Sequence, residues 1–189
     1  MAETKNIDEI AGRLSKDIFK HFLWATHPKT DDNFECANEK HVGEGGKPKS
    51  THPGDVAFYY RDPYLGKTVY LHTDLKSYAE DTITSTRLRG AFKSLCMTID
   101  CARCSDSWRA KYSVDEGEAH EVRGLLFVHN HDNGYDKPFY DAVDKVNLQA
   151  LPVAPGTQLH YFGPHDIQRL YSIANDIIRL KGEGELPST

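Results

Sequence analysis

The 189-residue sequence lacks any stretch of 18 or more apolar residues, the length that a membrane-spanning helix requires. Its first residues, MAETKNIDEIAGRLSKDIF, also lack the basic start and the apolar middle that are typical of a secretory signal. Both absences argue against a membrane-spanning or secreted chain. We therefore expect a cytoplasmic protein.

The sequence also has few cysteines and no excess of positive charge. In an intracellular chain of this length the four cysteines are better explained as reduced thiols or metal ligands than as a disulfide framework. The formal net charge is −5, so the composition gives no general signature of polyanion binding. Any contact with nucleic acid must come from local basic patches.

Apolar residues, in contrast, are sufficient for one well-buried core. Hydrophobic residues make up 39% of the chain and aromatic residues 11%. A chain of 189 residues is long enough for one such core and too short for two. We expect a single domain that spans residues 1–189.

The spacing of apolar residues predicts helices and strands in alternation. Helical spacing occurs at residues 7–24, 84–105, 139–148 and 163–182. Strand-like segments occur at residues 34–42, 55–61, 67–75, 123–130 and 158–162. A Gly-, Pro- and Lys-rich stretch, residues 43–54, predicts a mobile loop. This order predicts an α/β fold in which helices flank a mixed β-sheet.

The hairpin of residues 55–75 carries charged residues among apolar ones. Asp55 begins its first strand, and Asp74 and Lys76 lie at the end of the second, on one face with Tyr70 and His72. Two carboxylates on adjacent strands repel each other unless a cation lies between them, and oxygen ligands suit Mg²⁺ or Mn²⁺. A lysine on the same face can stabilise a phosphorane-like transition state, so the set is suited to phosphodiester hydrolysis.

These residues, in this order between helices, resemble the PD-(D/E)xK nuclease superfamily, with a restriction-endonuclease-like αβββαβ core. The likeness covers about residues 7–130 and leaves residues 131–181 as a C-terminal α/β extension. It implies a Mg²⁺- or Mn²⁺-dependent endonuclease that cleaves DNA. Asp55 and Asp74 would bind the metal together with the backbone carbonyl of Leu75, and Lys76 would be the catalytic lysine. The sequence departs from the superfamily motif at Gly54, which separates Pro53 from the first acid.

The segments DPY, DLKSY, CAR and VHNHD also resemble a nuclease subunit from a bacterial phage-defence operon. That resemblance implies a role in antiviral defence. It further implies a homo-oligomer or a partner protein subunit that controls activity.

Several other residues are candidates for accessory roles. Asp17 and Glu39 could supply an extra carboxylate or could be plain surface charges, and His72 could contact a phosphate or water or be a packed side chain. Basic residues that could contact DNA, or could only be solvated, are Arg87, Arg89, Lys93, Lys47 and Lys49.

The cysteines and histidines allow a second kind of metal site. One cysteine upstream of the hairpin, Cys36, and three downstream, Cys96, Cys101 and Cys104, faintly resemble the iron–sulfur ligands of some nucleases of this superfamily. Three sulfurs within one regular helix converge poorly, so we expect buried free thiols. His129, His131 and Asp132 could hold a transition metal or could be ordinary strand-end polarity.

Two alternatives to the nuclease hypothesis remain open from the sequence. The first is a catalytically silent nuclease-like module that binds DNA or a protein partner, although the intact acid–acid–lysine set favours activity. The second is a metal-binding scaffold built on cysteine and histidine.

Overall fold

A five-stranded mixed sheet forms the centre of the protein in a computed structural model, which describes residues 2–113, 117, 119–151 and 153–187. The strands lie in the order β1-β4-β5-β6-β7. Neighbours are antiparallel from β1 to β5 and parallel from β5 to β7. The bounds are β1 Ala25–Thr30, β4 Val56–Asp62, β5 Lys67–Tyr78, β6 His120–Asn130 and β7 Leu159–Phe162. The prediction of an α/β fold with a mixed sheet and a C-terminal helix is confirmed.

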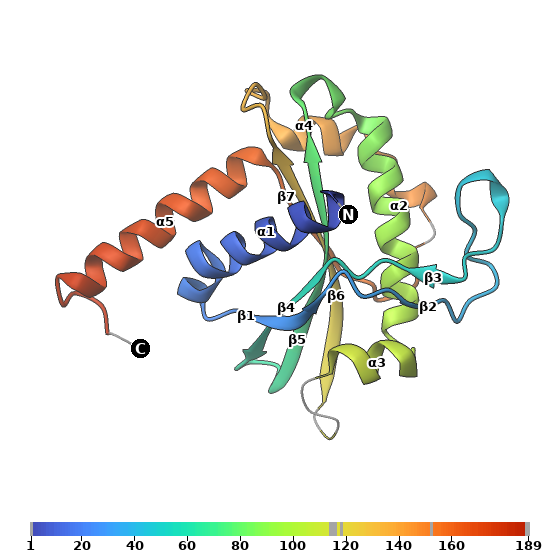
Figure 1. Ribbon diagram of the computed structural model, residues 1–189, viewed down its shortest axis with the longest axis horizontal. Coiled ribbons are helices and arrows are strands. Elements are labelled where there is room, and N and C mark those ends of the chain that lie inside the picture. Colours follow the sequence, from blue (N-terminus) through green and yellow to red (C-terminus); the bar gives the residue numbers. More distant parts are fainter. Residues whose placement is uncertain (1, 114–116, 118, 152, 188–189) are drawn as a thin grey trace.

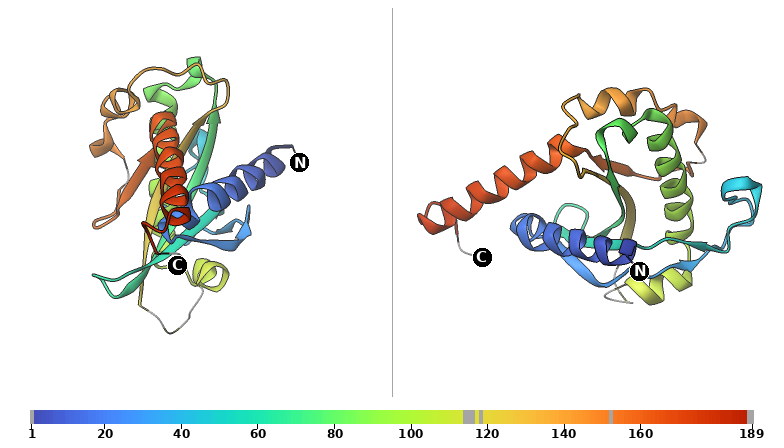
Figure 2. Two further views of the ribbon diagram at one scale, coloured as in Figure 1. Left: turned by 90° about the vertical axis from the view of Figure 1, so that its left-hand side faces the viewer. Right: turned by 45° about the horizontal axis from the view of Figure 1, so that its top comes forward.

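Helices cover both faces of this sheet (Figures 1 and 2). One face carries α1 (Ala2–Asp17) and α5 (Pro164–Gly182), and the other carries α2 (Ser85–Ala102), α3 (Asp106–Tyr112) and α4 (Phe139–Asp144). Alternate residues of each strand feed the two cores, because successive side chains of a strand point to opposite faces. The core under α1 includes Leu14, Ile18, Phe58, Leu71 and Leu75. The core under α2 includes Tyr70, Leu88, Leu95, Ile99 and Leu126.

Helix α2 begins where a side chain caps it and ends earlier than the sequence predicts. Thr84 accepts a hydrogen bond from the backbone N–H of Arg87 at 3.3 Å, a typical N-cap. The helix ends at Ala102 because Ser105 starts a new one, accepting a hydrogen bond from the N–H of Trp108 at 3.1 Å. The short helix α3 was missed in the sequence.

The N-terminal third differs most from the prediction. The helix expected over residues 7–24 ends at Asp17, and a 3₁₀ turn, η1 (Phe19–Phe22), follows it. Residues 25–30, for which no strand was predicted, form edge strand β1. It pairs with β4 and tolerates Pro28 because an edge strand leaves part of its backbone unpaired. Tertiary pairing therefore decided this segment against its local turn signals.

The strand predicted over residues 34–42 is also wrong. Only β2 (Phe34–Glu35) is extended there, and it pairs with β3 (Thr51–His52), which lies inside the stretch that was predicted as a mobile loop. We call residues 34–52 the arm; Figure 1 shows it running across α2. It also contains the 3₁₀ turn η2 (Glu44–Gly46).

The C-terminal part continues the same sheet. Strand β7 pairs with β6, and α5 packs against β6 and β7. The short 3₁₀ turns η3 (Glu80–Thr82) and η4 (Leu148–Ala150) connect the other elements. Among the described residues, no helix combines the length and the apolar composition that a membrane crossing requires.

Candidate active site

The hairpin register brings the two predicted acids side by side. Val56 pairs with Thr73 and Ala57 with His72, so one further step sets Asp55 against Asp74. Both acids lie on the α2 face of the sheet, where they line one tight crevice together with residues of α2, Leu95 and Thr98. The residues that sequence reasoning paired across two strands therefore lie together in space.

Each carboxylate has a defined partner. The backbone N–H of Leu75 donates a hydrogen bond to Oδ2 of Asp55 at 2.8 Å. Nζ of Lys76 lies 2.6 Å from Oδ1 of Asp74 as an ion pair. That Oδ1 atom is buried, so the ammonium balances the charge of this carboxylate inside the protein.

The electrostatics of the pair show how poorly it tolerates two negative charges. Burial, and next the neighbouring Asp74, raise the pKa of Asp55 from 3.8 to about 7, although the Leu75 N–H and Lys76 oppose this. Burial lowers the pKa of Lys76, but the ion pair with Asp74 outweighs burial and the net pKa is raised. The lysine therefore stays an ammonium, while Asp55 keeps its proton up to about neutral pH.

This donor set fits a divalent cation. Two buried carboxylates that repel each other are the hard, anionic ligands that Mg²⁺ and Mn²⁺ prefer. A bound cation would take the place of the proton on Asp55. Asp55, Asp74 and the carbonyl of Leu75 are the atoms of this chain available to hold it.

The glycine that breaks the Pro-Asp motif has a steric cause. A Cβ on Gly54 would overlap the hydroxyl of Tyr112 and lie 2.5 Å from the carbonyl oxygen of Asp32. The Tyr112 hydroxyl donates a hydrogen bond to that same carbonyl oxygen at 2.6 Å. Helix α3 thus clamps the chain just before Asp55, and only glycine fits under the clamp.

His72 belongs to this clamp as a packed side chain. It is fully buried, with Nε2–H donating to the carbonyl oxygen of Pro53 at 2.9 Å and Nδ1 accepting from Nε1–H of Trp108 at 3.2 Å. Burial lowers the pKa of His72, which keeps the ring neutral. These contacts support the packed alternative for this residue.

The two carboxylates proposed as accessories lie elsewhere. Asp17 is exposed at the end of α1, on the face of the sheet opposite the acid pair. Glu39 is exposed in the arm. Among the described residues, no hydrogen bond or ion pair joins either of them to Asp55 or Asp74.

The basic candidates divide into two groups. Arg87 lies over the ring of Tyr78, two residues beyond Lys76, with its guanidinium carbon 5.7 Å from the ring centre. Lys49 is half-buried; burial lowers its pKa, while Cys36 and Asp74 act in the opposite direction. These two side chains therefore flank the acid pair.

The other basic candidates are less closely placed. Arg89 donates from Nη1 to the carbonyl oxygen of Asn147 at 3.2 Å, away from the hairpin. Lys93 is exposed on α2 and Lys47 is exposed near the tip of the arm.

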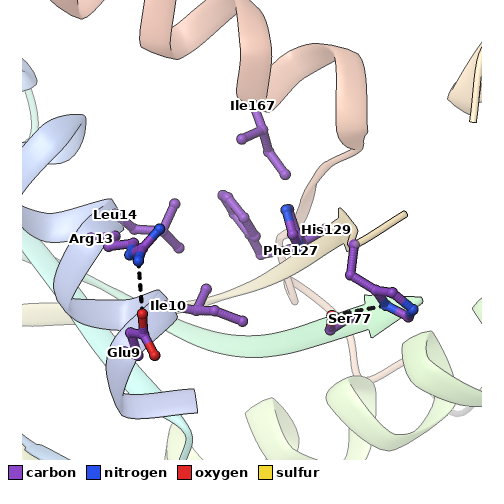
Figure 3. A pocket seen from close by; sticks show the side chains of 9 residues that line it. Glu9, Ile10, Arg13, Leu14, Ser77, Phe127, His129 and Ile167 are labelled. Atoms are coloured by element: carbon purple, nitrogen blue, oxygen red, sulfur yellow. Dashed lines mark hydrogen bonds and ion pairs between the residues drawn. The ribbon is translucent and has the colours of Figure 1, made fainter. Parts of the chain in front are cut away.

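The histidines at the end of β6 line a cavity of about 550 Å³ between α1, α5 and the sheet (Figure 3). Nδ1 of His131 lies 3.3 Å from the hydroxyl of Ser77. Asp132 caps a turn, since its carboxylate accepts hydrogen bonds from the backbone of Glu80 and Gly134 and from the side chain of Asn130. These contacts support ordinary strand-end polarity for this segment.

A cluster that sequence reasoning missed lies beside the acid pair. Cys36, His41, His52 and Cys101 place their ligand atoms within 4.8 Å of one another. Cys96 is buried elsewhere on α2 and Cys104 is exposed beyond its end, so the grouping of downstream cysteines does not form. The two histidines, His41 and His52, were not considered in the sequence, although their spacing from Cys36 was an available signal.

Comparison with known families identifies the chain. A family model described as the GAPS4 protein PD-(D/E)XK nuclease domain matches residues 1–166. No curated protein and no solved structure matches. The match confirms the resemblance drawn from the hairpin residues and extends it past β6 to the start of α5. The chain therefore belongs to the GAPS4 family of PD-(D/E)XK nuclease domains.

Proposed function

We propose that this nuclease is a Mg²⁺- or Mn²⁺-dependent DNA endonuclease whose active site is formed by Asp55, Asp74 and Lys76. The observation that carries the proposal is the placement of two buried carboxylates side by side, one directly before β4 and one in β5, with an ammonium 2.6 Å from one of them. A cation bound there would supply charge neutralisation and Lewis-acid chemistry at the scissile phosphate.

The residues of the chain have distinct tasks in this proposal. Asp55 is held in position by the Leu75 N–H, and its carboxylate and that of Asp74 bind the metal together with the Leu75 carbonyl. Lys76 keeps its positive charge, because the carboxylates raise its pKa, and stabilises the negative charge that develops on the phosphate oxygens. Its side chain is one-third exposed, which leaves it within reach of a substrate.

DNA contacts are proposed for the basic residues around this site. Arg87 and Lys49 flank the acid pair, and Lys47, Lys93 and Arg89 would extend the contact along the arm and α2. Five such charges are few for a chain with a net charge of −5, so we propose that a second copy or a partner subunit completes the DNA-binding surface and controls cleavage. Antiviral defence in the cytoplasm is the setting that the phage-defence resemblance supports.

Plasmid nicking across a titration of Mg²⁺ and Mn²⁺ tests the proposal, with any controlling partner supplied and an RNA substrate run in parallel. The wild type should nick supercoiled DNA only when a divalent cation is present. Lys67→Ala is a matched control, since Lys67 lies on the same strand and pairs with Glu121 at 2.8 Å, away from the acid pair. DNA binding without metal-dependent cleavage would instead support the catalytically silent module.

A further inference from the structure

We propose that Cys36, His41, His52 and Cys101 bind one structural zinc ion, at a site separate from the acid pair. The ligands come from three places: the loop after β2, strand β3 and the C-terminal half of α2. This site goes beyond the nuclease function, since its sulfur and nitrogen atoms differ in kind from the oxygens of Asp55 and Asp74.

Four of the six distances between the ligand atoms are close to those of a tetrahedral zinc site, and all six are within 4.8 Å. Sγ of Cys36 lies 3.8 Å from Sγ of Cys101, and these sulfurs lie 3.6 and 3.4 Å from Nδ1 of His41. That nitrogen lies 3.3 Å from Nε2 of His52. Zinc bonds of ~2.3 Å to sulfur and ~2.05 Å to nitrogen at tetrahedral angles give edges of about 3.8, 3.6 and 3.3 Å for the S–S, S–N and N–N pairs.

The outer hydrogen bonds orient both histidines as ligands. Nε2–H of His41 donates to Oδ2 of Asp100 at 3.0 Å, so Nδ1 carries the lone pair that faces the cluster. The Thr98 hydroxyl donates to the Ser94 carbonyl oxygen at 3.0 Å and is left to accept from Nδ1–H of His52 at 3.4 Å, which turns the Nε2 lone pair inward. Carboxylate and hydroxyl partners of this kind support metal-binding histidines.

Charge and geometry favour zinc over other occupants. Two thiolates and two neutral imidazoles around Zn²⁺ make a site of zero net charge, which can be buried at little cost, and its formation releases two thiol protons. The sulfurs are too far apart for a disulfide bond, which requires about 2.05 Å. In a Rieske cluster the cysteines and histidines bind different irons, which would separate the two pairs.

The site explains how the arm is held in place. Among the described side chains of residues 36–50, only His41 is buried, so the arm has almost no apolar core of its own. A metal that joins His41 and Cys36 to Cys101 would supply the missing anchor. Because His52 directly precedes the segment that leads to Asp55, the same anchor fixes the start of the catalytic hairpin.

Metal analysis of the untagged, full-length protein tests this inference. We expect close to one zinc per chain, and replacement by Co²⁺ should give the strong visible absorption and sulfur-to-cobalt charge transfer of a tetrahedral S₂N₂ site. Cys36→Ser and Cys101→Ser should lose zinc, whereas Cys104→Ser, three residues away on the same segment, should retain it. If the ligand variants fail to fold, Asp100→Asn serves instead and should bind zinc 10–100-fold more weakly.

The experiments distinguish a failure of the zinc site from a failure of the nuclease proposal. Asp74→Ala should lose cleavage and keep its zinc, because no ligand of the cluster comes from the acid pair. Substoichiometric zinc with an octahedral Co²⁺ spectrum, an iron–sulfur absorption band, or unchanged zinc in Cys101→Ser would each overturn the zinc site while leaving the nuclease proposal intact.

Discussion

Replacing Asp55 by asparagine should make the Mg²⁺-free protein more stable at high pH. The pKa of Asp55 is about 7 in the folded protein, against the ordinary aspartate value of 3.8 that applies to the unfolded chain. A carboxyl whose pKa is raised by folding contributes its full stability below pH 3.8 and loses that contribution as the pH rises toward 7. Asparagine keeps an oxygen for the Leu75 N–H but carries no charge at any pH.

The size of the effect follows from the two pKa values. Between pH 5 and pH 8 the wild type should lose about 2–3 kcal/mol of unfolding free energy relative to Asp55→Asn. For a protein of this length that loss corresponds to roughly 5–10 °C in Tm. Only the difference between the two proteins is informative, because buried histidines such as His72, whose pKa burial lowers, gain stability over part of the same range in both.

Thermal and urea unfolding at four or five pH values, with and without Mg²⁺, would measure this. The Mg²⁺ should be omitted rather than chelated, since a chelator would also strip the proposed zinc. Added Mg²⁺ should stabilise the wild type most at pH 8 and should have little effect on Asp55→Asn. Parallel pH profiles for the two proteins would refute the raised pKa of Asp55.

Three further predictions concern single residues. Lys76→Ala should lower the nicking rate about 10²-fold or more at every metal concentration. Asp74→Ala, in contrast, should be partly rescued by excess Mg²⁺ or Mn²⁺. Rescue of Lys76→Ala by metal would contradict the catalytic role of Lys76. In urea unfolding, Gly54→Ala should destabilise the fold by about 2 kcal/mol or more. The control is Gly90→Ala on α2, where an added Cβ would have no atom within 4 Å. This variant should be neutral or more stable by up to about 1 kcal/mol. Trp108→Phe removes the donor to His72 and should cost about 1–3 kcal/mol of stability and reduce cleavage; wild-type unfolding would show that this hydrogen bond does not matter.

Much of the fold was readable from the chain because its signals are local. The catalytic hairpin has strand-forming residues and a Pro- and Gly-marked turn, and α2 has both a cap at Thr84 and an apolar stripe. Strand β1 and helix α3 were missed for the opposite reason. An edge strand that contains Pro28 is specified by its neighbour β4, and α3 is too short for periodicity to identify.

The sequence by itself determined which residues are proposed as catalytic and the order in which they follow along the chain. Period-two alternation placed Asp74 and Lys76 on one face, and the hairpin placed Asp55 opposite them. The sequence alone therefore predicted the nuclease chemistry. Only the tertiary structure decided that His72 is a buried support and that Gly54 lies beneath Tyr112. The same holds for the contact between Cys36 and Cys101, which are 65 residues apart in the sequence. Alternation along a strand is a local property, whereas contacts across such a separation depend on how the arm folds over α2, and no spacing along the chain encodes that.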